Sequence, residues 1–283
     1  MTDSSTPREA SDAATRPPLA VGIAGLGAIG RAVARRLDQG MPGVRLSAVA
    51  VRDAAKARTF LDSLSRPVPV LPLDALAQQS EIVIECAPAA LLARIAAPVL
   101  IAGKKVIVLS VGALLDDPQL ETLAREHGGQ ILVPTGALIG LDAVSAAAEG
   151  TIHSVRMVTR KPIAGLAGAP FLRENNIDIA GITQPLKLFS GTARDAARGF
   201  PANLNVAVAL SLAGIGPDRT LLEIWADPTV TRNTHHIEVD ADCARFSMTI
   251  ENVPSENPRT GRITALSVIA LLRKLSAPVR VGT

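Results

Sequence analysis

A glycine pattern near the N-terminus, Gly25-Leu26-Gly27-Ala28-Ile29-Gly30, constrains the fold of this chain more than any other feature. An apolar run of strand length, residues 19–24, precedes it. After it, Ile29, Val33 and Leu37 recur at four-residue spacing, which predicts a helix with one buried face. A strand, a glycine turn and a helix in this order form the unit that binds a dinucleotide. The same string also occurs as a plain structural turn, but its two flanks favour a cofactor site.

Each glycine has a separate role in such a turn. Gly25 permits the tight turn, Gly27 lets the backbone approach the pyrophosphate, and Gly30 lets the helix lie close to the strand. Ala28 and Ile29 begin the helix, whose free N–H groups face the phosphates. The expected cofactor, NAD or NADP, would therefore contact residues 25 and 27–30.

The second predicted strand, residues 44–51, ends at Arg52-Asp53. An acidic residue about 20 positions past the glycines binds the ribose 2′-hydroxyl of NAD, whereas a nearby arginine suits the 2′-phosphate of NADP. Asp53 is also a good N-cap for the helix that follows. Arg52 and Asp53 are therefore candidate cofactor residues, and the preference between NAD and NADP stays open.

Strands and helices alternate through the rest of the first half, which predicts a parallel sheet with right-handed crossovers. The expected strands are residues 68–71, 81–86, 105–109 and 130–133, and the expected helices begin at residues 54, 89 and 118. Ligands of such sheets bind beyond the carboxyl ends of the strands. The loops after Cys86, Leu109 and Val133 are thus candidate walls of a nicotinamide site, although each could equally be an ordinary connection.

From about residue 151 the pattern changes. Strand-like runs at residues 152–159, 185–189, 221–226 and 245–249 include a clean period of two, which indicates an antiparallel sheet with one covered face. Residues 196–213 are expected to form one buried helix with Pro201 in its first turn. A second apolar helix is expected at residues 260–275.

The predicted fold class is α/β, with a Rossmann-type parallel-sheet domain followed by an α+β domain that contains a mixed or antiparallel sheet. We expect a disordered tail at residues 1–18, a dinucleotide-binding domain at 19–137 and a catalytic and oligomerisation domain at 138–259. The helix at 260–275 could pack back on the first domain.

Composition excludes several other classes of protein. The 283 residues are 48% hydrophobic and 19% charged, with a net charge of +3, scattered arginines and 2% aromatics, which argues against nucleic-acid binding. Cys86 and Cys243 are too far apart in sequence to suggest a disulfide framework or a metal site. The absence of a signal peptide and of a membrane-spanning segment leads us to expect a cytoplasmic protein.

Several strings together carry a family resemblance. They are the glycine pattern, Pro134-Thr135-Gly136-Ala137, Phe200-Pro201-Ala202-Asn203-Leu204-Asn205, Asn233-Thr234-His235 and residues 251–260, ENVPSENPRT. From about residue 19 to its end, the chain resembles the L-aspartate dehydrogenases. The resemblance implies oxidative deamination of L-aspartate with NAD(P) to iminosuccinate, which hydrolyses to oxaloacetate and ammonia and in the family can feed NAD biosynthesis. Alternatives are a relative of homoserine dehydrogenase or dihydrodipicolinate reductase, and a non-catalytic NAD(P)-binding protein.

The resemblance also implies roles for individual residues. Ala137 and Asn203 match cofactor-contact positions, and the catalytic histidine falls on His235. His236 follows it directly, but adjacent residues of a strand point to opposite faces, so at most one of the two faces a given pocket. Histidine suits the role of base because it titrates near neutral pH.

The two carboxylates of L-aspartate need cationic partners. Arg160 and Lys161, at the end of a predicted strand, and Arg232, just before the histidines, are the candidates, although charged strand ends are often merely solvated. Because the second domain of such two-domain dehydrogenases usually forms an oligomer interface, we expect a homodimer.

Overall fold

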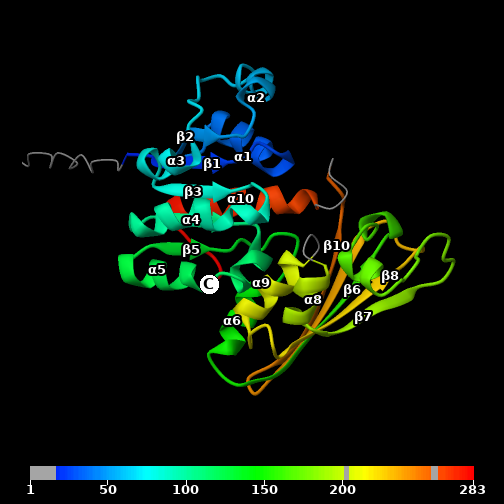
Figure 1. Cartoon of the computed structure of the whole chain (residues 1–283). Coiled ribbons are helices and arrows are strands. Elements are labelled where there is room, and N and C mark those ends of the chain that lie inside the picture. The colour runs from blue at the N-terminus through cyan, green and yellow to red at the C-terminus, as the bar shows by residue number, and fades with distance from the viewer. Residues whose placement is uncertain (1–16, 201–203, 256–260) are drawn as a thin grey trace, which may run out of the picture.

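The computed structural model describes residues 17–200, 204–255 and 261–283 of the chain. Within these residues the protein has two five-stranded sheets, each with its own helices (Figure 1). This arrangement confirms the predicted fold class. The predicted tail lies largely outside the described residues, and the division between domains after residue 137 stays a prediction.

The first sheet is entirely parallel. Its strands lie in the order β2 (Val44–Ala50), β1 (Leu19–Ala24), β3 (Ile82–Glu85), β4 (Lys105–Val108) and β5 (Gln130–Leu132). The strand expected at residues 68–71 is reduced to a single bridge between Val49 and Val70. This short segment continues directly into the next helix, so little of it is left to pair with β2.

Helices cover both faces of the first sheet. They are α1 (Ala28–Asp38), α2 (Ala54–Leu61), α3 (Leu73–Gln79), α4 (Leu92–Ile101), α5 (Gln119–His127) and α10 (Arg262–Ser276). Strand β3 shows why residues 82–84 are apolar: Ile82 and Ile84 join the core beneath α1, whereas Val83 joins the core beneath α4. A strand buried on both faces needs an apolar run, and these three residues supply it.

Helix α10 comes last in the sequence but belongs spatially to the first sheet. Its buried residues Val268 and Leu272 pack in one core with Val33 and Leu37 of α1 (Figure 1, red and blue). The chain therefore leaves the first domain, builds the second and returns, so the two domains are joined by more than one covalent connection.

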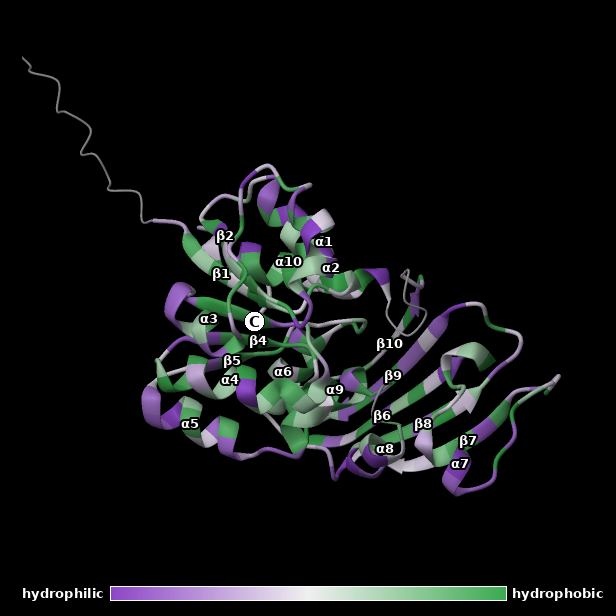
Figure 2. Ribbon diagram, turned by 45° about the horizontal axis from the view of Figure 1, so that its top comes forward, coloured by the Kyte–Doolittle hydropathy of each residue, from purple (hydrophilic) through white to green (hydrophobic). Residues whose placement is uncertain are grey.

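The second sheet is mixed, with the order β10 (Arg245–Asn252), β9 (Asn233–Ala241), β6 (Ile152–Lys161), β8 (Thr220–Ala226) and β7 (Leu186–Thr192). Only β6 and β8 are parallel neighbours; the other pairs are antiparallel. Hydrophilic and hydrophobic residues alternate along these strands, as the colours of the ribbon show (Figure 2). The core on the covered face includes residues of α6 (Leu141–Ala148), α7 (Pro170–Glu174), α8 (Ala193–Gly199) and α9 (Asn205–Ala213).

The helix expected at residues 196–213 is wrong as a single element. Helix α8 ends at Gly199 and α9 begins at Asn205. Phe200 has φ −133° and ψ 51°, which is outside the helical region, because a residue before proline is disfavoured there. Its ring is buried and stacks on Phe171 with ring centroids 5.0 Å apart. The predicted position of Pro201 in a first helical turn lies outside the described residues.

Candidate functional site

The glycine turn between β1 and α1 contains two glycines that the fold requires and one that faces open space. Gly25 has φ +101°, and a Cβ there would lie 2.5 Å from the Cys86 carbonyl oxygen. A Cβ on Gly30 would clash with the Gly25 carbonyl oxygen. A Cβ on Gly27, in contrast, would meet nothing within 4 Å. Gly25 and Gly30 are therefore required by the chain itself, whereas Gly27 leaves room in front of the helix N-terminus.

A pocket of about 850 Å³ opens at this turn. From the first domain it is lined by Gly27, Ala28 and Ile29 and by the loops after β3, β4 and β5, as expected for the carboxyl edge of a parallel sheet. From the second domain it is lined by the end of β6, the beginning of α9 and the beginning of β9. Gly25 and Gly30, which the sequence predicts to contact the cofactor, do not line the pocket.

The tandem histidines lie on opposite faces of β9. His235 is 3% exposed, lines the pocket and has its Nδ1 atom 3.1 Å from the Thr159 Oγ1 atom on the paired strand β6. His236 is on the outer face, with its Nδ1 atom 2.8 Å from the Thr249 Oγ1 atom. Only His235 can therefore act in this pocket, which agrees with the alternation expected from the sequence.

Lys161 enters the same pocket from the end of β6. Its side chain is on the inner face with Thr159 and His235, and the residue is 4% exposed. Burial lowers the pKa of Lys161 to about 8. Burial also lowers the pKa of His235, to about 3, and the nearby Lys161 charge acts in the same direction. The site therefore combines an imidazole that stays neutral at neutral pH with an ammonium that stays charged below about pH 8.

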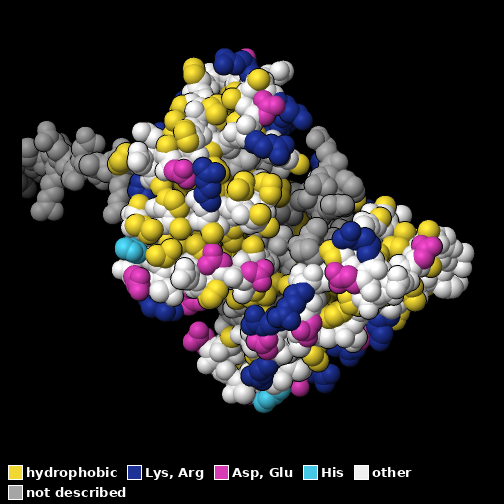
Figure 3. All heavy atoms as spheres, in the orientation of Figure 1, with side chains coloured by type: hydrophobic (Ala, Val, Ile, Leu, Met, Phe, Trp, Pro, Cys, Tyr) yellow, Lys and Arg dark blue, Asp and Glu magenta, His cyan; other side chains and the backbone are white. Residues whose placement is uncertain are grey.

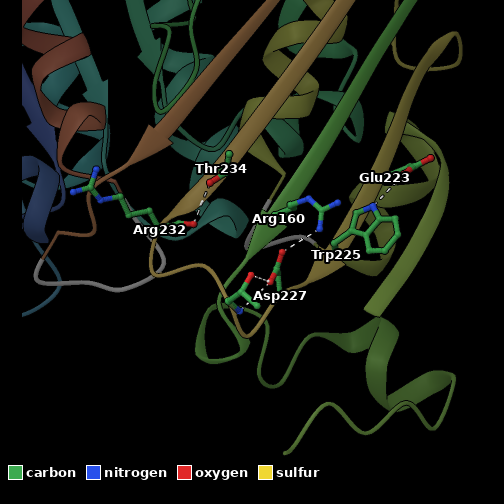
Figure 4. A network of polar contacts seen from close by, with 7 residues as sticks. Arg160, Glu223, Trp225, Asp227, Arg232 and Thr234 are labelled. Atoms are coloured by element: carbon green, nitrogen blue, oxygen red, sulfur yellow. Dashed lines mark hydrogen bonds and ion pairs between the residues drawn. The ribbon is translucent and has the colours of Figure 1, made fainter. Parts of the chain in front are cut away.

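Arg160 and Arg232, the other two candidates for the substrate carboxylates, do not line the pocket. Arg160 is on the outer face of the sheet, where its Nη1 atom lies 3.0 Å from the Asp227 carboxylate and its guanidinium lies 4.8 Å from the Trp225 ring centroid (Figure 4). Arg232 points away from this group (Figure 4). Its Nη1 atom lies 3.9 Å from the Glu251 carboxylate. Among the three candidates, the structure brings only Lys161 next to His235.

Of the remaining expected cofactor residues, one lines the pocket and two lie outside it. Ala137 lines the pocket, and its carbonyl oxygen accepts a hydrogen bond of 2.9 Å from Asn252 Nδ2. Arg52 and Asp53 lie outside the pocket, and Asp53 caps α2 by accepting a 3.0 Å hydrogen bond from the Lys56 N–H. Asn203 lies outside the described residues.

Sequence reasoning missed Glu85, the last residue of β3. The residue is fully buried, lines the pocket and accepts four hydrogen bonds from the loops after β3 and β4. Burial raises its pKa, although these hydrogen bonds act in the opposite direction. A single acidic residue at the end of an otherwise apolar strand was the signal in the sequence, because a strand buried on both faces excludes a charge without partners.

Within the described residues, no group of His, Cys, Asp and Glu side chains could hold a metal ion. None of the described helices is long and apolar enough to cross a membrane. Lys and Arg side chains are scattered, with Asp and Glu among them, over the face seen in Figure 3.

Comparison with known proteins identifies the family. The sequence model described as "Homoserine dehydrogenase, NAD binding domain" matches residues 25–134, and the one described as "Aspartate dehydrogenase, C-terminal" matches residues 142–275. An L-aspartate dehydrogenase of Bradyrhizobium diazoefficiens is 65% identical over 96% of this chain and 97% of its own length. The chain belongs to the L-aspartate dehydrogenase family.

A second relative agrees with this assignment, and a solved structure shares the fold. The L-aspartate dehydrogenase 3 of Bordetella bronchiseptica is 66% identical over 95% of this chain and 99% of its own length. A solved structure of aspartate dehydrogenase from Thermotoga maritima superposes with a TM-score of 0.71 at 21% identity, covering 93% of this chain and 99% of that one. At this identity the superposition shows that the fold is shared by the family.

Replacing Gly27 by valine tests the cofactor turn. The new side chain fits the folded protein but occupies the space in front of α1, so NAD(P) affinity should fall about 10- to 100-fold with little change in melting temperature. Gly30→Ala is the matched control, because its Cβ meets the Gly25 carbonyl and should lower the melting temperature. Calorimetric titration and thermal unfolding measure the two effects. Unchanged NAD(P) affinity in folded Gly27→Val protein would remove the basis for the cofactor site.

Proposed function

We propose that the protein catalyses the NAD(P)-dependent oxidative deamination of L-aspartate to iminosuccinate, which hydrolyses to oxaloacetate and ammonia. The observation that carries the proposal is one pocket in which the Gly27–Ile29 turn of the first domain faces His235 and Lys161 of the second. Relatives of nearly full length that are named L-aspartate dehydrogenase support the choice of substrate.

The pocket residues fit a dinucleotide and a dicarboxylate. The unobstructed Gly27 and the free N–H groups of the first turn of α1 suit a pyrophosphate. The cofactor, when bound, supplies the hydride acceptor. We assign Lys161 to one substrate carboxylate, because a buried ammonium pairs strongly with an anion. Arg52 and Asp53, at the end of β2, are proposed to lie toward the adenosine ribose, where the guanidinium would favour NADP and the carboxylate NAD.

We assign His235 the role of base. Its neutral imidazole can accept a proton from the substrate ammonium or from the hydrolytic water. In the tautomer whose Nδ1–H donates to Thr159 Oγ1, the Nε2 atom carries no proton and can accept one. Thr159 would in this way orient the imidazole ring.

An assay panel followed by absorbance at 340 nm tests the activity. L-aspartate, homoserine and other amino acids are offered with NAD and with NADP, and dihydrodipicolinate with the reduced cofactors. The proposal expects reduction of NAD or NADP with L-aspartate. Turnover with homoserine or dihydrodipicolinate alone would assign a different reductase, and cofactor binding without any turnover would indicate a non-catalytic protein.

Two alanine variants test the base. His235→Ala should lower kcat by on the order of 10²–10⁴-fold with little change in cofactor affinity, because the proton acceptor is lost. His236→Ala, on the outer face of the same strand, is the matched control and should keep most of the activity. The two variants are measured side by side with L-aspartate. Near wild-type turnover of His235→Ala would refute its assignment as the base.

Succinate tests the role of Lys161, because it carries two carboxylates but no amino group that titrates. Lys161→Met should weaken succinate binding to the enzyme with NAD about 10- to 100-fold. Wild-type affinity should fall as the pH rises through about 8, since the ammonium then loses its proton, and the variant should lack this dependence. Arg160→Met, on the outer face, is the control. A pH-independent affinity that Lys161→Met leaves unchanged would contradict the assignment.

We propose that a second copy of this chain binds the outer face of the second sheet. On this face Leu221 is 50% exposed and Trp225 is flanked by Arg160 and Lys187, while Arg156 and Glu223 provide charges of both signs. A face with both signs can meet its own copy about a two-fold axis. Light scattering should give about twice 29.4 kDa, and Trp225→Glu should halve that mass. A monomeric wild-type protein would contradict the homodimer.

We also propose a cytoplasmic location. Cys86 and Cys243 are both free thiols, which suits a reducing compartment. Fractionation of cells that express the protein tests this, and recovery outside the cytoplasmic fraction would contradict it.

A further inference from the structure

We propose that Glu85 is a positioning residue of the cofactor pocket, whose carboxylate fixes the loops after β3 and β4 in the arrangement that holds the nicotinamide half of the dinucleotide. The inference rests on the proposed function, since it assumes that the pocket binds NAD(P). It assigns a role to the one buried acidic side chain that lines the pocket within the described residues and that the proposed chemistry leaves unused.

The Glu85 carboxylate accepts hydrogen bonds from both loops. Its Oε1 atom accepts hydrogen bonds from the Ala87 N–H at 3.1 Å and from Ser110 Oγ at 3.0 Å. Its Oε2 atom accepts from the Leu109 N–H at 3.1 Å and from the Ser110 N–H at 2.8 Å. One side chain thus ties the chain just after β3 to the chain just after β4.

The four donors explain why this buried position holds a carboxylate. Three of them are backbone N–H groups, which cannot reverse their direction, and a carboxylate has only acceptor atoms to offer them. An apolar residue would leave these N–H groups without a partner, and a buried N–H without an acceptor costs free energy. The loops themselves therefore replace the hydrogen bonds that the carboxylate loses with water, and these bonds oppose the rise in its pKa that burial causes.

The two tied loops form one side of the pocket. Residues 86–89 and 109–113 all line it. The first loop also presents the Cys86 carbonyl to Gly25 of the glycine turn. The second continues to Gly112, whose N–H donates a 3.0 Å hydrogen bond to Asn205 Oδ1 in the second domain. Displacement of the Glu85 carboxylate would therefore change the pocket wall that joins the two domains.

The other end of the dinucleotide would be held by different contacts. The pyrophosphate is assigned to the turn at Gly27, and the adenosine ribose to the end of β2, where Gly25 N–H donates to the Ala50 carbonyl oxygen at 2.8 Å. Glu85 makes none of its four hydrogen bonds to these segments. ADP-ribose, which lacks the nicotinamide ring, is thus a probe that depends on the turn but not on the tied loops.

Glu85→Gln is the test variant. Glutamine keeps the shape, but its NH₂ group must face either the N–H groups of Leu109 and Ser110 or the N–H of Ala87, so at least one backbone donor loses its acceptor. Glu81→Gln is the matched control just before the opposite end of β3, where Glu81 Oε2 accepts a 2.9 Å hydrogen bond from the Ala20 N–H.

Calorimetric titration measures the affinities of wild type and both variants for NAD and for ADP-ribose. Glu85→Gln should bind NAD on the order of tenfold more weakly and ADP-ribose with unchanged affinity. Glu81→Gln should bind both as the wild type does. A purely structural role would lower the melting temperature and affect both ligands equally or neither, and either of these results in Glu85→Gln would overturn the inference.

A second variant covers the case in which Glu85→Gln does not fold. Ser110→Ala removes a single neutral donor and keeps every backbone contact of Glu85. It should weaken NAD binding by a smaller factor and leave ADP-ribose binding unchanged; equal losses, or no loss of NAD affinity, would overturn the inference. A wild-type protein that bound neither NAD nor ADP-ribose would refute the proposed function as well, whereas normal binding of both by all variants would refute the inference alone.

Discussion

Burial of three ionisable side chains around one pocket shifts the pKa of each of them. Glu85, Lys161 and His235 come from β3, β6 and β9 and are 0%, 4% and 3% exposed. Removal from water disfavours the charged form of each group, so the pKa of Glu85 rises and the pKa values of Lys161 and His235 fall. The shifts place a neutral imidazole beside an ammonium that can pair with an anion. Because its pKa is lowered to about 3, His235 is a weaker base here than the near-neutral titration expected from the sequence.

The same pocket depends on contacts that join the two domains. Asn205 accepts from the Gly112 N–H, and Asn252 donates to the Ala137 carbonyl. Within the first domain, Ser267 Oγ of α10 accepts from the Gly136 N–H at 3.1 Å. Each contact links a loop at the carboxyl edge of the first sheet to an element that comes much later in the sequence. The return of helix α10 to the first sheet provides a further attachment. The loops of the first sheet that line the pocket are thus held by residues of the second domain and by α10.

Much of the fold was readable from local patterns. The run of residues 19–24, the glycine string and the four-residue apolar spacing predicted β1, the turn and α1, and the period of two at residues 245–250 predicted β10 with its half-buried face. The predictions were wrong where strand pairing or backbone geometry determines whether an element forms. The segment at residues 68–71 forms only one bridge, and the non-helical Phe200 divides what its apolar composition suggested was one helix.

By itself the sequence determined the class of fold, the glycine turn and the alternation that separates His235 from His236, because each follows from the spacing of neighbouring residues. Only the tertiary structure decided which cation faces the pocket. Lys161 and Arg160 are adjacent, but the covered face of the sheet belongs to Lys161, and Arg160 pairs with Asp227 on the other side. It also decided the surroundings of Glu85, since its hydrogen-bond donors at Leu109 and Ser110 lie on a different strand and loop. Burial and long-range hydrogen bonding depend on how distant segments pack, and no local pattern contains that information.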